Sequence, residues 1–327
     1  MAADRLDDLL DADHRRVLRT LPPELLNPHE VPEARHRFQE YLNALAGQGP
    51  PEPPPTDVVT VSEALAPPVV ADQAPVRVKV YRPVVAPERR SGLLVWIHGG
   101  GMVLGTADYD DTRCGAMVAA LGVTIVSVDY RLAPEHPYPA AVDDCMAALA
   151  WAVAEADALA VDPERIAVGG ASAGGGLAAA VALRARDEGG PALCYQHLVY
   201  PMLDDRQITP SSHAITDARV WNRTSNAAAW AVYLADLPTG SEVPPYAAPA
   251  RAVDLAGLPP AFIPVGQFDL FLDENIDYAT RLLQAGVPVE LRVYPGAFHG
   301  SDGLVPDSPV TIRWLADELD SLRRALT

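Results

Sequence analysis

GGASAGGG (residues 169–176) contains five glycines and one serine between two apolar runs. The run RIAV (165–168) before it predicts a buried strand, and LAAAVALRAR (177–186) after it predicts a helix. Glycine at the start of a helix weakens that helix by up to about 1 kcal/mol per residue relative to alanine. A turn with so many glycines therefore indicates a functional requirement, and Ser172 carries its one functional side chain.

Within this turn, Gly170, Ser172 and Gly174 form the pattern GxSxG. This pattern is typical of a sharp strand-to-helix turn that exposes the serine oxygen on a strained backbone, and the start of the following helix favours negative charge. No GxGxxG dinucleotide pattern fits these glycines. The only lysine, Lys79, is far from them in sequence, which excludes a GxxxxGK[ST] phosphate loop. The turn predicts a nucleophilic serine, which needs a base and donors for an oxyanion.

A second glycine run, HGGG, lies upstream within WIHGGGMVLG (96–105). It places His98 and three glycines, Gly99 to Gly101, at the end of an expected strand. Glycines at this position let backbone N–H groups line a pocket, because no side chain obstructs them. The run therefore predicts the oxyanion site that the serine requires.

The composition restricts the class of protein. The chain has 327 residues, 49% of them hydrophobic, and a formal net charge of −18. The acidic balance argues against nucleic acid and anionic membranes as partners, because both need basic patches. The sequence has no run of 18 apolar residues that would predict a membrane span, and its N-terminus does not resemble a signal peptide. Three cysteines in apolar stretches, Cys114, Cys145 and Cys194, predict reduced core residues and a cytoplasmic protein.

Short apolar runs alternate with longer helical ones along most of the chain. This alternation predicts an α/β architecture, in which helices cover both faces of a mostly parallel sheet. The expected strands are 57–65, 76–83, 92–98, 123–130, 165–170, 195–201, 261–266 and 289–296. The expected helices are 110–122, 140–156, 177–186, 273–286 and 309–326.

Two parts of the chain depart from this alternation. Residues 1–46 predict helices with charged faces, followed by a proline-rich linker at 47–57. Residues 202–255 interrupt the rhythm and include a helical piece at 225–236. We interpret both parts as a cap over a catalytic core. The predicted units are the N-terminal part of the cap (1–50), the first part of the core (51–201), the cap insertion (202–255) and the second part of the core (256–327).

Five motifs in this order resemble those of the hormone-sensitive-lipase-like family of α/β-hydrolase esterases. They are HGGG (98–101), DYRLAPEHPYPAA (129–141), GxSAGG (170–175), FDLFLDE (268–274) and YPGAFHG (294–300). The resemblance runs from about residue 75 to the C-terminus. It implies the α/β-hydrolase fold, with a mostly parallel eight-stranded sheet flanked by helices and a two-part helical cap.

The resemblance also implies roles for individual residues. It implies Ser172 as the nucleophile, Asp269 as the acid and His299 as the base, and the chain order Ser, Asp, His is the one that this fold requires. It implies an oxyanion hole formed by the backbone of Gly99, Gly100 and Ala173. The candidate substrate-binding residues are Met102, Val103 and Trp221. No metal ligand is predicted.

Some assignments remain open from the sequence. Asp273 and Glu274 compete with Asp269 for the role of the acid, although both also suit the start of a helix, where carboxylates are favoured. Asp143 and Asp144 fit the surface of a helix or a structural role, and His98 fits support of the glycine loop. The chain departs from the family pattern at Ala171, at Met102 and in the polar residues that follow His299.

The expected activity is that of a serine carboxylesterase that hydrolyses short- to medium-chain acyl esters without metal or organic cofactor. An amidase, a lactonase or an acyl transferase could use the same residues. A non-catalytic protein that binds a small molecule is the alternative from another class. The expected partner is a small-molecule ester, and relatives often form dimers, so a homodimer is also considered.

Overall fold

The computed structural model describes residues 9–21, 31–46, 57–85 and 89–327. The predicted linker therefore lies outside the described residues, apart from Asp57.

One eight-stranded sheet forms the centre of the molecule, in the strand order β1-β2-β4-β3-β5-β6-β7-β8. Strand β2 pairs antiparallel with β1 and β4, and every later pairing is parallel. This confirms the predicted mostly parallel, eight-stranded sheet. The strands are β1 (Val59–Ala66), β2 (Val76–Pro83), β3 (Ser91–Ile97), β4 (Thr124–Val128), β5 (Val161–Ala171), β6 (Tyr195–Val199), β7 (Ala261–Phe268) and β8 (Val289–Phe298).

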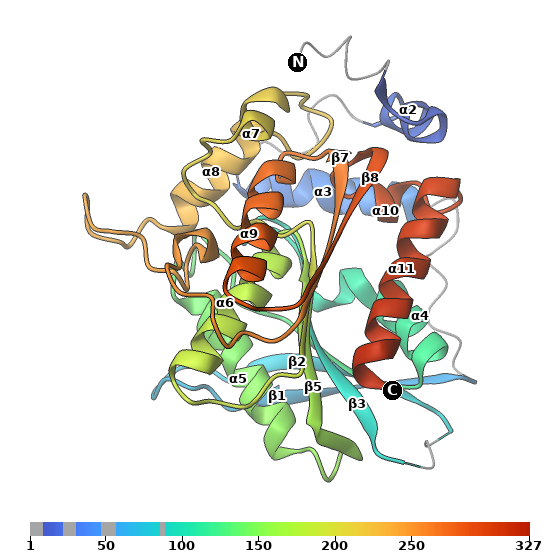
Figure 1. Ribbon diagram of the computed structural model, residues 1–327, viewed down its shortest axis with the longest axis vertical. Helices are drawn as coiled ribbons and strands as arrows, with labels where there is room; N and C mark the ends of the chain where they lie inside the picture. Colours follow the sequence, from blue (N-terminus) through green and yellow to red (C-terminus); the bar gives the residue numbers. More distant parts are fainter. Residues whose placement is uncertain (1–8, 22–30, 47–56, 86–88) are drawn as a thin grey trace.

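Helices cover both faces of this sheet, so its central strands are buried (Figure 1). Helices α4 (Asp111–Leu121) and α11 (Pro309–Leu326) pack together on one face. Helices α5 (Ala140–Ala154), α6 (Ala173–Asp187) and α9 (Leu272–Gln284) contribute to a separate core that is associated with the other face. Burial of apolar side chains on two faces is what continuous apolar strands require.

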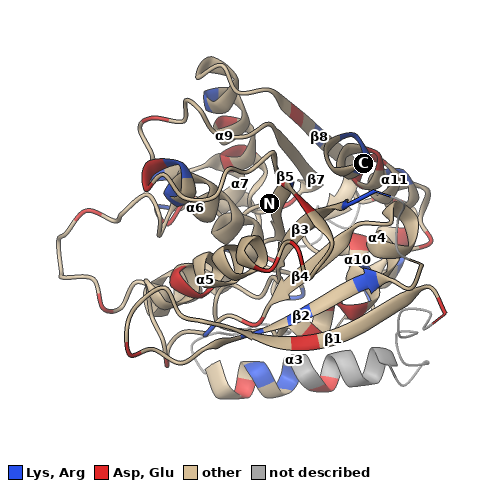
Figure 2. Ribbon diagram, turned by 90° about the horizontal axis from the view of Figure 1, so that it is seen from below, with Lys and Arg blue, Asp and Glu red and all other residues tan. Residues whose placement is uncertain are grey.

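The remaining described helices are α2 (Ala12–Leu18), α3 (Val31–Ala46), α7 (Pro210–Ala214), α8 (Arg223–Tyr233) and α10 (Ser301–Leu304), besides two 3-10 turns at Ala107–Asp110 and Pro249–Arg251. Helices α2, α7 and α8 lie at the end of the molecule where β7 and β8 end (Figure 1), and α3 lies along another side, below β1 in Figure 2. The guanidinium of Arg35 in α3 donates to the carbonyls of Val103 (2.8 Å) and Ala133 (2.9 Å). The N-terminal helices are thus fastened to loops at the carboxyl edge of the sheet.

Several boundaries differ from the sequence expectations. Strand β7 continues two residues beyond Gly266, to Phe268. Helix α8 begins two residues earlier than expected, because the side chain of Asn222 caps it by accepting from the N–H groups of Thr224 and Ser225. These are local effects of capping and pairing that apolar periodicity does not report.

Asp143 and Asp144 do not lie on an exposed helix surface, so that alternative was wrong. Both are buried, and they form ion pairs with Arg184 (2.6 Å) and Arg131 (2.7 Å) respectively. Their role is therefore structural: they tie α5 to α6 and to the loop after β4.

Acidic residues appear on several elements and alternate with basic ones (Figure 2). The only lysine, Lys79, is buried and pairs with Asp108 (2.8 Å) and Asp111 (2.5 Å). Within the described residues, no helix is both long and apolar enough to cross a membrane.

Candidate active site

The glycine-rich turn lies between β5 and α6, with Ser172 at the point where the chain reverses. Ser172 has φ 59° and ψ −120°, a conformation that costs on the order of 1–3 kcal/mol for a residue with a side chain. Its N–H donates to the carbonyl of Val199 (2.9 Å), and its carbonyl accepts from the N–H of Met202 (3.0 Å). These bonds to the end of β6 and to the segment that follows it hold the strained turn in place.

Glycine is required on both sides of the serine because the backbones approach closely there. A Cβ on Gly170 would lie 2.5 Å from the carbonyl oxygen of Ile97, at the end of β3, and as close to the backbone of Gly174. A Cβ on Gly174 would also overlap the Ile97 carbonyl. The glycines thus allow α6 to begin directly against β3 and β5. This close approach explains why glycines stand at the start of a helix although they weaken it.

His299 follows β8 and reaches across to the turn. Its Nε2 lies 3.0 Å from Ser172 Oγ, and its Nδ1 lies 2.8 Å from Asp269 Oδ2. The His299 side chain is 10% exposed and that of Asp269 is fully buried. Distances of this size are those expected of a nucleophile, a base and an orienting carboxylate. The structure therefore brings together the three side chains that the sequence singled out.

The three competing carboxylates have different partners. Asp269 follows β7 directly, contacts His299 and also accepts from the N–H of Phe271 (2.8 Å). Asp273 accepts from the N–H of Ser211 (2.6 Å). Glu274 is buried, and its carboxylate accepts from the N–H of Leu203 and of the next residue, while burial raises its pKa well above the usual range.

Asp273 and Glu274 lie in the first turn of α9, as expected. In addition, both bind backbone N–H groups of the 202–255 segment. Sequence reasoning missed this role in fastening the insertion. Only Asp269 lies within hydrogen-bond distance of the histidine ring.

The HGGG loop lies beside the serine. A Cβ on Gly99 would lie 3.0 Å from the carbonyl oxygen of Ala171, so this glycine is in direct contact with the turn. Across the described chain, no hydrogen bond is formed by the N–H groups of Gly99, Gly100 or Ala173. Three backbone donors near one serine are available for a ligand oxygen.

His98 supports this loop from behind. Its Nδ1 lies 2.7 Å from the carbonyl of Gly99, and its ring stacks on Tyr130 with a centroid distance of 4.2 Å. The Tyr130 hydroxyl donates to the carbonyl of His98 (3.0 Å). Burial lowers the pKa of His98, which favours the neutral ring.

The three candidate substrate-binding residues all lie at this loop and are buried. Met102 has φ 61° and is 2% exposed, and Val103 is fully buried with its carbonyl bound to Arg35. The ring of Trp221 lies so close to Gly101 that a Cβ there would overlap it. A residue of the 202–255 segment thus covers the glycine loop.

Two aromatic rings that the sequence did not single out flank His299. Tyr200 packs on it edge to face at a centroid distance of 4.6 Å, and Phe271 does so at 5.1 Å. The hydroxyl of Tyr200 donates to Asp302 (2.8 Å), which lies three residues after the histidine. The polar residues after His299 were the one signal in the sequence that pointed to this contact.

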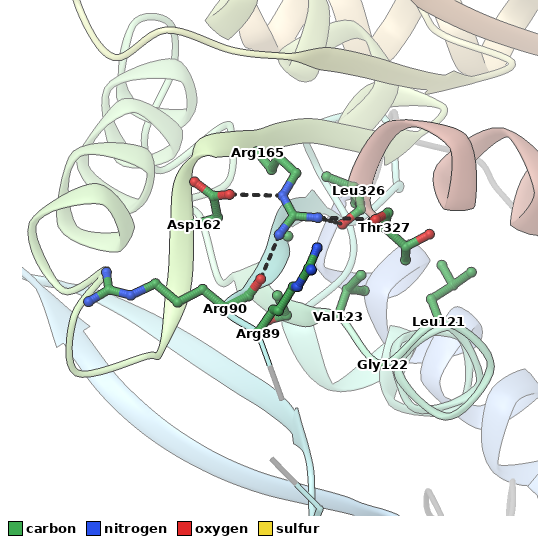
Figure 3. Close-up of a pocket in the computed structure, with 11 residues that line it drawn as sticks. Arg89, Arg90, Leu121, Gly122, Val123, Asp162, Arg165, Leu326 and Thr327 are labelled. Carbon is green, nitrogen blue, oxygen red and sulfur yellow. Dashed lines mark hydrogen bonds and ion pairs between the residues drawn. The ribbon is translucent and has the colours of Figure 1, made fainter. Parts of the chain in front are cut away.

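A separate pocket of about 660 Å³ lies at the opposite, amino edge of the sheet (Figure 3). Arg165 crosses it and makes four hydrogen bonds: it binds Asp162 (3.0 Å), the carbonyl of Arg90 (2.6 Å) and the carbonyls of Leu326 and Thr327. Figure 3 shows the side chain of Arg90 directed away from the pocket. This pocket contains no nucleophile and base in contact, so it is not the candidate active site.

In the residues that the structure describes, no three His, Cys, Asp or Glu side chains are grouped so as to hold a metal ion.

A mostly parallel sheet between two helical layers, with a serine on a strained turn after β5, defines an α/β hydrolase. A model of the α/β-hydrolase fold family matches residues 94–302. The chain belongs to this family, the hormone-sensitive-lipase-like α/β hydrolases, as its motifs predict. The expected fold and the expected class of carboxylic ester hydrolase are thereby confirmed.

Named relatives support this membership. The chain is 42% identical over 251 residues to the carboxylesterase NlhH of Mycobacterium tuberculosis, covering 76% of this chain and 78% of that protein. It is 31% identical over 274 residues to the ethyl acetate hydrolase of Pseudomonas putida, covering 83% and 82% respectively. A solved structure named Bacterial Heroin Esterase superposes with a TM-score of 0.91 at 40% identity, covering 98% of this chain and 99% of that one.

Proposed function

We propose that the protein is a serine carboxylesterase that hydrolyses short- to medium-chain acyl esters through Ser172, His299 and Asp269. The observation that carries the proposal is the continuous contact from Ser172 Oγ to His299 Nε2 (3.0 Å) and from His299 Nδ1 to Asp269 (2.8 Å). A serine hydroxyl becomes an effective nucleophile when such a base can take its proton.

In the proposed reaction, His299 accepts the proton of Ser172 as the oxygen attacks the ester carbonyl. The developing oxyanion accepts hydrogen bonds from the N–H groups of Gly99, Gly100 and Ala173. Collapse of the tetrahedral intermediate breaks the ester bond, and His299 gives its proton to the leaving alcohol. Water then attacks the acyl-enzyme with the same base, which releases the acid and restores the serine. Asp269 holds the imidazole tautomer and stabilises the imidazolium.

The size of the substrate is proposed from the cap and from a relative. Trp221, Met102 and Val103 are all buried, and the Trp221 ring lies against Gly101 of the glycine loop, which favours a small acyl group. The name of the relative ethyl acetate hydrolase refers to a short ester. We propose residues 1–50 and 202–255 as the two parts of the cap that set this limit.

A series of p-nitrophenyl esters from acetyl to dodecanoyl tests the proposal. The expected result is hydrolysis with the highest kcat/KM at short to medium chain length, unchanged by EDTA. Mass spectrometry of the protein quenched during turnover of a slow ester should detect one acyl group on the peptide that contains Ser172. Absence of ester hydrolysis across the series, or acylation of another residue, would contradict the proposal.

We also propose that the protein is cytoplasmic, and a homodimer is considered as its oligomeric state. Cys114, Cys145 and Cys194 are free thiols in the structure, which suits the reducing cytoplasm. Light scattering coupled to size-exclusion chromatography tests whether the protein forms the homodimer considered from the sequence.

A further inference from the structure

The histidine of the candidate triad needs more than its two hydrogen bonds to keep its place. During the proposed reaction, His299 gains and loses a proton while its two nitrogens must stay aimed at Ser172 and Asp269. Its ring is flanked by Tyr200 and Phe271, whose centroids lie 4.6 Å and 5.1 Å away. Rotation of the imidazole therefore depends on how firmly these two rings are held.

Tyr200 is held at both ends. Its backbone has φ 34°, which is unusual for a residue with a side chain, and its N–H donates to the carbonyl of Pro264 (2.8 Å). Its hydroxyl donates to Asp302 Oδ1 (2.8 Å), and the tyrosine and the aspartate are only 5% and 3% exposed. Burial raises the pKa of Tyr200 well above its usual value, so the hydroxyl keeps the proton that it donates.

Asp302 is itself anchored from the far side. Its second oxygen accepts from Arg113 of α4 (2.7 Å). The same guanidinium binds both oxygens of Glu318 in α11 (2.7 and 3.0 Å) and lies over the ring of Trp96. Although burial raises it, the charge of Arg113 holds the pKa of Glu318 at about 2, so this carboxylate is ionised.

The contacts from His299 to Tyr200 and from Tyr200 to Asp302 lead back to the segment that carries His299. Asp302 lies on α10, three residues after His299, so the segment that carries the histidine also carries the acceptor that fixes the tyrosine against it. A phenylalanine at position 200 would fill most of the same volume but would leave Asp302 Oδ1 without its donor. Packing against His299 requires only the aromatic ring, so the hydroxyl and its bond to the buried carboxylate of Asp302 are not explained by packing alone.

We propose that Tyr200 is a positioning residue for His299, held in place by Asp302 and, through it, by Arg113. Tyr200 does not touch the substrate in this account. It keeps the imidazole ring at the angle that preserves both hydrogen bonds of the triad. The inference rests on the proposed function of Ser172 and His299.

The main test is Tyr200→Phe, which keeps the ring and removes the hydroxyl. A misplacement of about 1 Å in an active site can cost about 100-fold in rate, and a ring that is loosened but still present should cost less. We expect kcat on p-nitrophenyl acetate to fall about tenfold, with KM changed by less than about twofold, because binding of the ester is not altered.

The matched control is Tyr294→Phe. Tyr294 is also buried, on β8, and its hydroxyl donates to Asp317 over the same distance, 2.8 Å, without contact to His299. Loss of a tyrosine–aspartate bond, which is buried for Tyr200 and partly buried for Tyr294, should lower thermal stability in both variants, but kcat only in Tyr200→Phe. A kcat for Tyr200→Phe within about twofold of the wild type, or an equal loss in Tyr294→Phe, would overturn the proposal.

A spectroscopic readout follows the ring directly. The proton between His299 Nδ1 and Asp269 should give a resolved downfield NMR signal in the wild type and in Tyr294→Phe. In Tyr200→Phe the signal should broaden or disappear, because the ring samples more orientations. An unchanged signal together with a lower kcat would assign the loss to something other than the histidine.

Asp302→Asn tests the route by which the tyrosine is held. If Asp302 acts through Tyr200, the double variant Asp302→Asn/Tyr200→Phe should lose little more activity than the more damaged single variant. Additive losses would mean that the two residues act independently. Should Asp302→Asn not fold, Tyr200→Phe and its control still decide the proposal.

Failure of this inference can be told from failure of the proposed function. If the wild type hydrolyses esters and Ser172→Ala does not, the function stands whatever Tyr200→Phe does. If Ser172→Ala remains active, the function itself is wrong and the role of Tyr200 fails with it.

Discussion

The two edges of the sheet contain similar polar groups but hold them in different ways. At the carboxyl edge, Ser172 on its strained turn and Asp269 are 6% and 1% exposed, and the N–H groups of Gly99, Gly100 and Ala173 have no hydrogen-bond partner among the described residues. At the amino edge, the side chains of Arg165 and Asp162 are about a third exposed, and the arginine makes four hydrogen bonds to protein groups. A pocket of about 660 Å³ lies at this edge.

The two edges differ in how many hydrogen-bond donors lack a partner and in how strained the backbone is. An arginine that already makes four hydrogen bonds stabilises the chain segments that it bridges and has few donors left for a ligand. Strained backbone and unused donors cost stability, and they persist where the surroundings enforce them, which is typical of functional sites. The contrast predicts that substitutions at the carboxyl edge change activity and that substitutions at the amino edge change stability.

The largest effect is expected from Ser172→Ala. Loss of the nucleophile of such a triad lowers kcat on the order of 10⁴ to 10⁶-fold, and the alanine variant should still fold because the turn is otherwise unchanged. The amino-edge counterpart is Ser91→Ala, at the start of β3, where the hydroxyl lies 3.4 Å from the hydroxyl of Thr124. Initial rates on one p-nitrophenyl ester, with circular dichroism for folding, compare the two. Activity of folded Ser172→Ala within tenfold of the wild type would refute the serine mechanism.

The next largest effect distinguishes two carboxylates four residues apart. Asparagine at a triad acid keeps the shape but favours the wrong imidazole tautomer, which costs about 10⁴ in kcat in trypsin. We expect Asp269→Asn to lower kcat at neutral pH by at least about 100-fold. Asp273→Asn should lower it by less than about tenfold, because its carboxylate binds Ser211 and belongs to the start of a helix. A crippled Asp273→Asn beside an active Asp269→Asn would mean that the acid is misassigned.

Much of the carboxyl edge is predictable because its signals are local. GxSxG places the nucleophile within five residues, and HGGG places the loop within four. The choice of Asp269 over Asp273 and Glu274 depends on a contact with a histidine 30 residues away, so the sequence alone leaves it open without the resemblance. The fold follows from alternation of apolar runs, which many residues specify together.

The support behind the triad is not predictable in the same way. Arg113 and Asp302 are 189 residues apart, and Arg35 reaches Val103 over 68. A buried arginine needs an acidic partner, but the amino-acid sequence does not say which of the 43 acidic residues of the chain supplies it. That choice is made only when α4, α10 and α11 pack together.

A smaller effect is expected where the N-terminal helices meet the glycine loop. Arg35→Ala removes the donors to the carbonyls of Val103 and Ala133, and also the ion pair with Glu135. We expect kcat/KM to fall by about 3- to 10-fold, more for octanoyl than for acetyl esters, since a hydrogen bond to a charged group contributes about 1.5–3 kcal/mol and exposure reduces this.

Glu135→Ala is the control, because it removes the exposed ion pair and keeps the bonds to the loop. Glu135 is 53% exposed at its side chain, so its loss should alter kcat/KM by less than about twofold. Equal chain-length profiles for Arg35→Ala and the wild type would argue against a role of α3 in the cap.

The smallest effect on activity is expected at the amino edge, from Arg165→Leu. This change removes the bonds to Asp162, Arg90 and the carbonyls at the end of α11, and leaves the apolar part of the side chain in place. Hydrogen bonds from a charged group contribute about 1.5–3 kcal/mol when buried, but this guanidinium is partly exposed, so we expect a loss of about 1–2 kcal/mol in the free energy of unfolding. The value of kcat should stay within about twofold of the wild type, because Arg165 lies near the start of β5 and Ser172 follows the opposite end of that strand. Arg89→Ala, in the same pocket, should change neither the free energy of unfolding nor kcat measurably.

Urea unfolding and ester kinetics on the same samples measure the free energy of unfolding and kcat. A fall in kcat without a fall in stability would show that the amino edge communicates with the triad, and the contrast between the two edges would then be wrong.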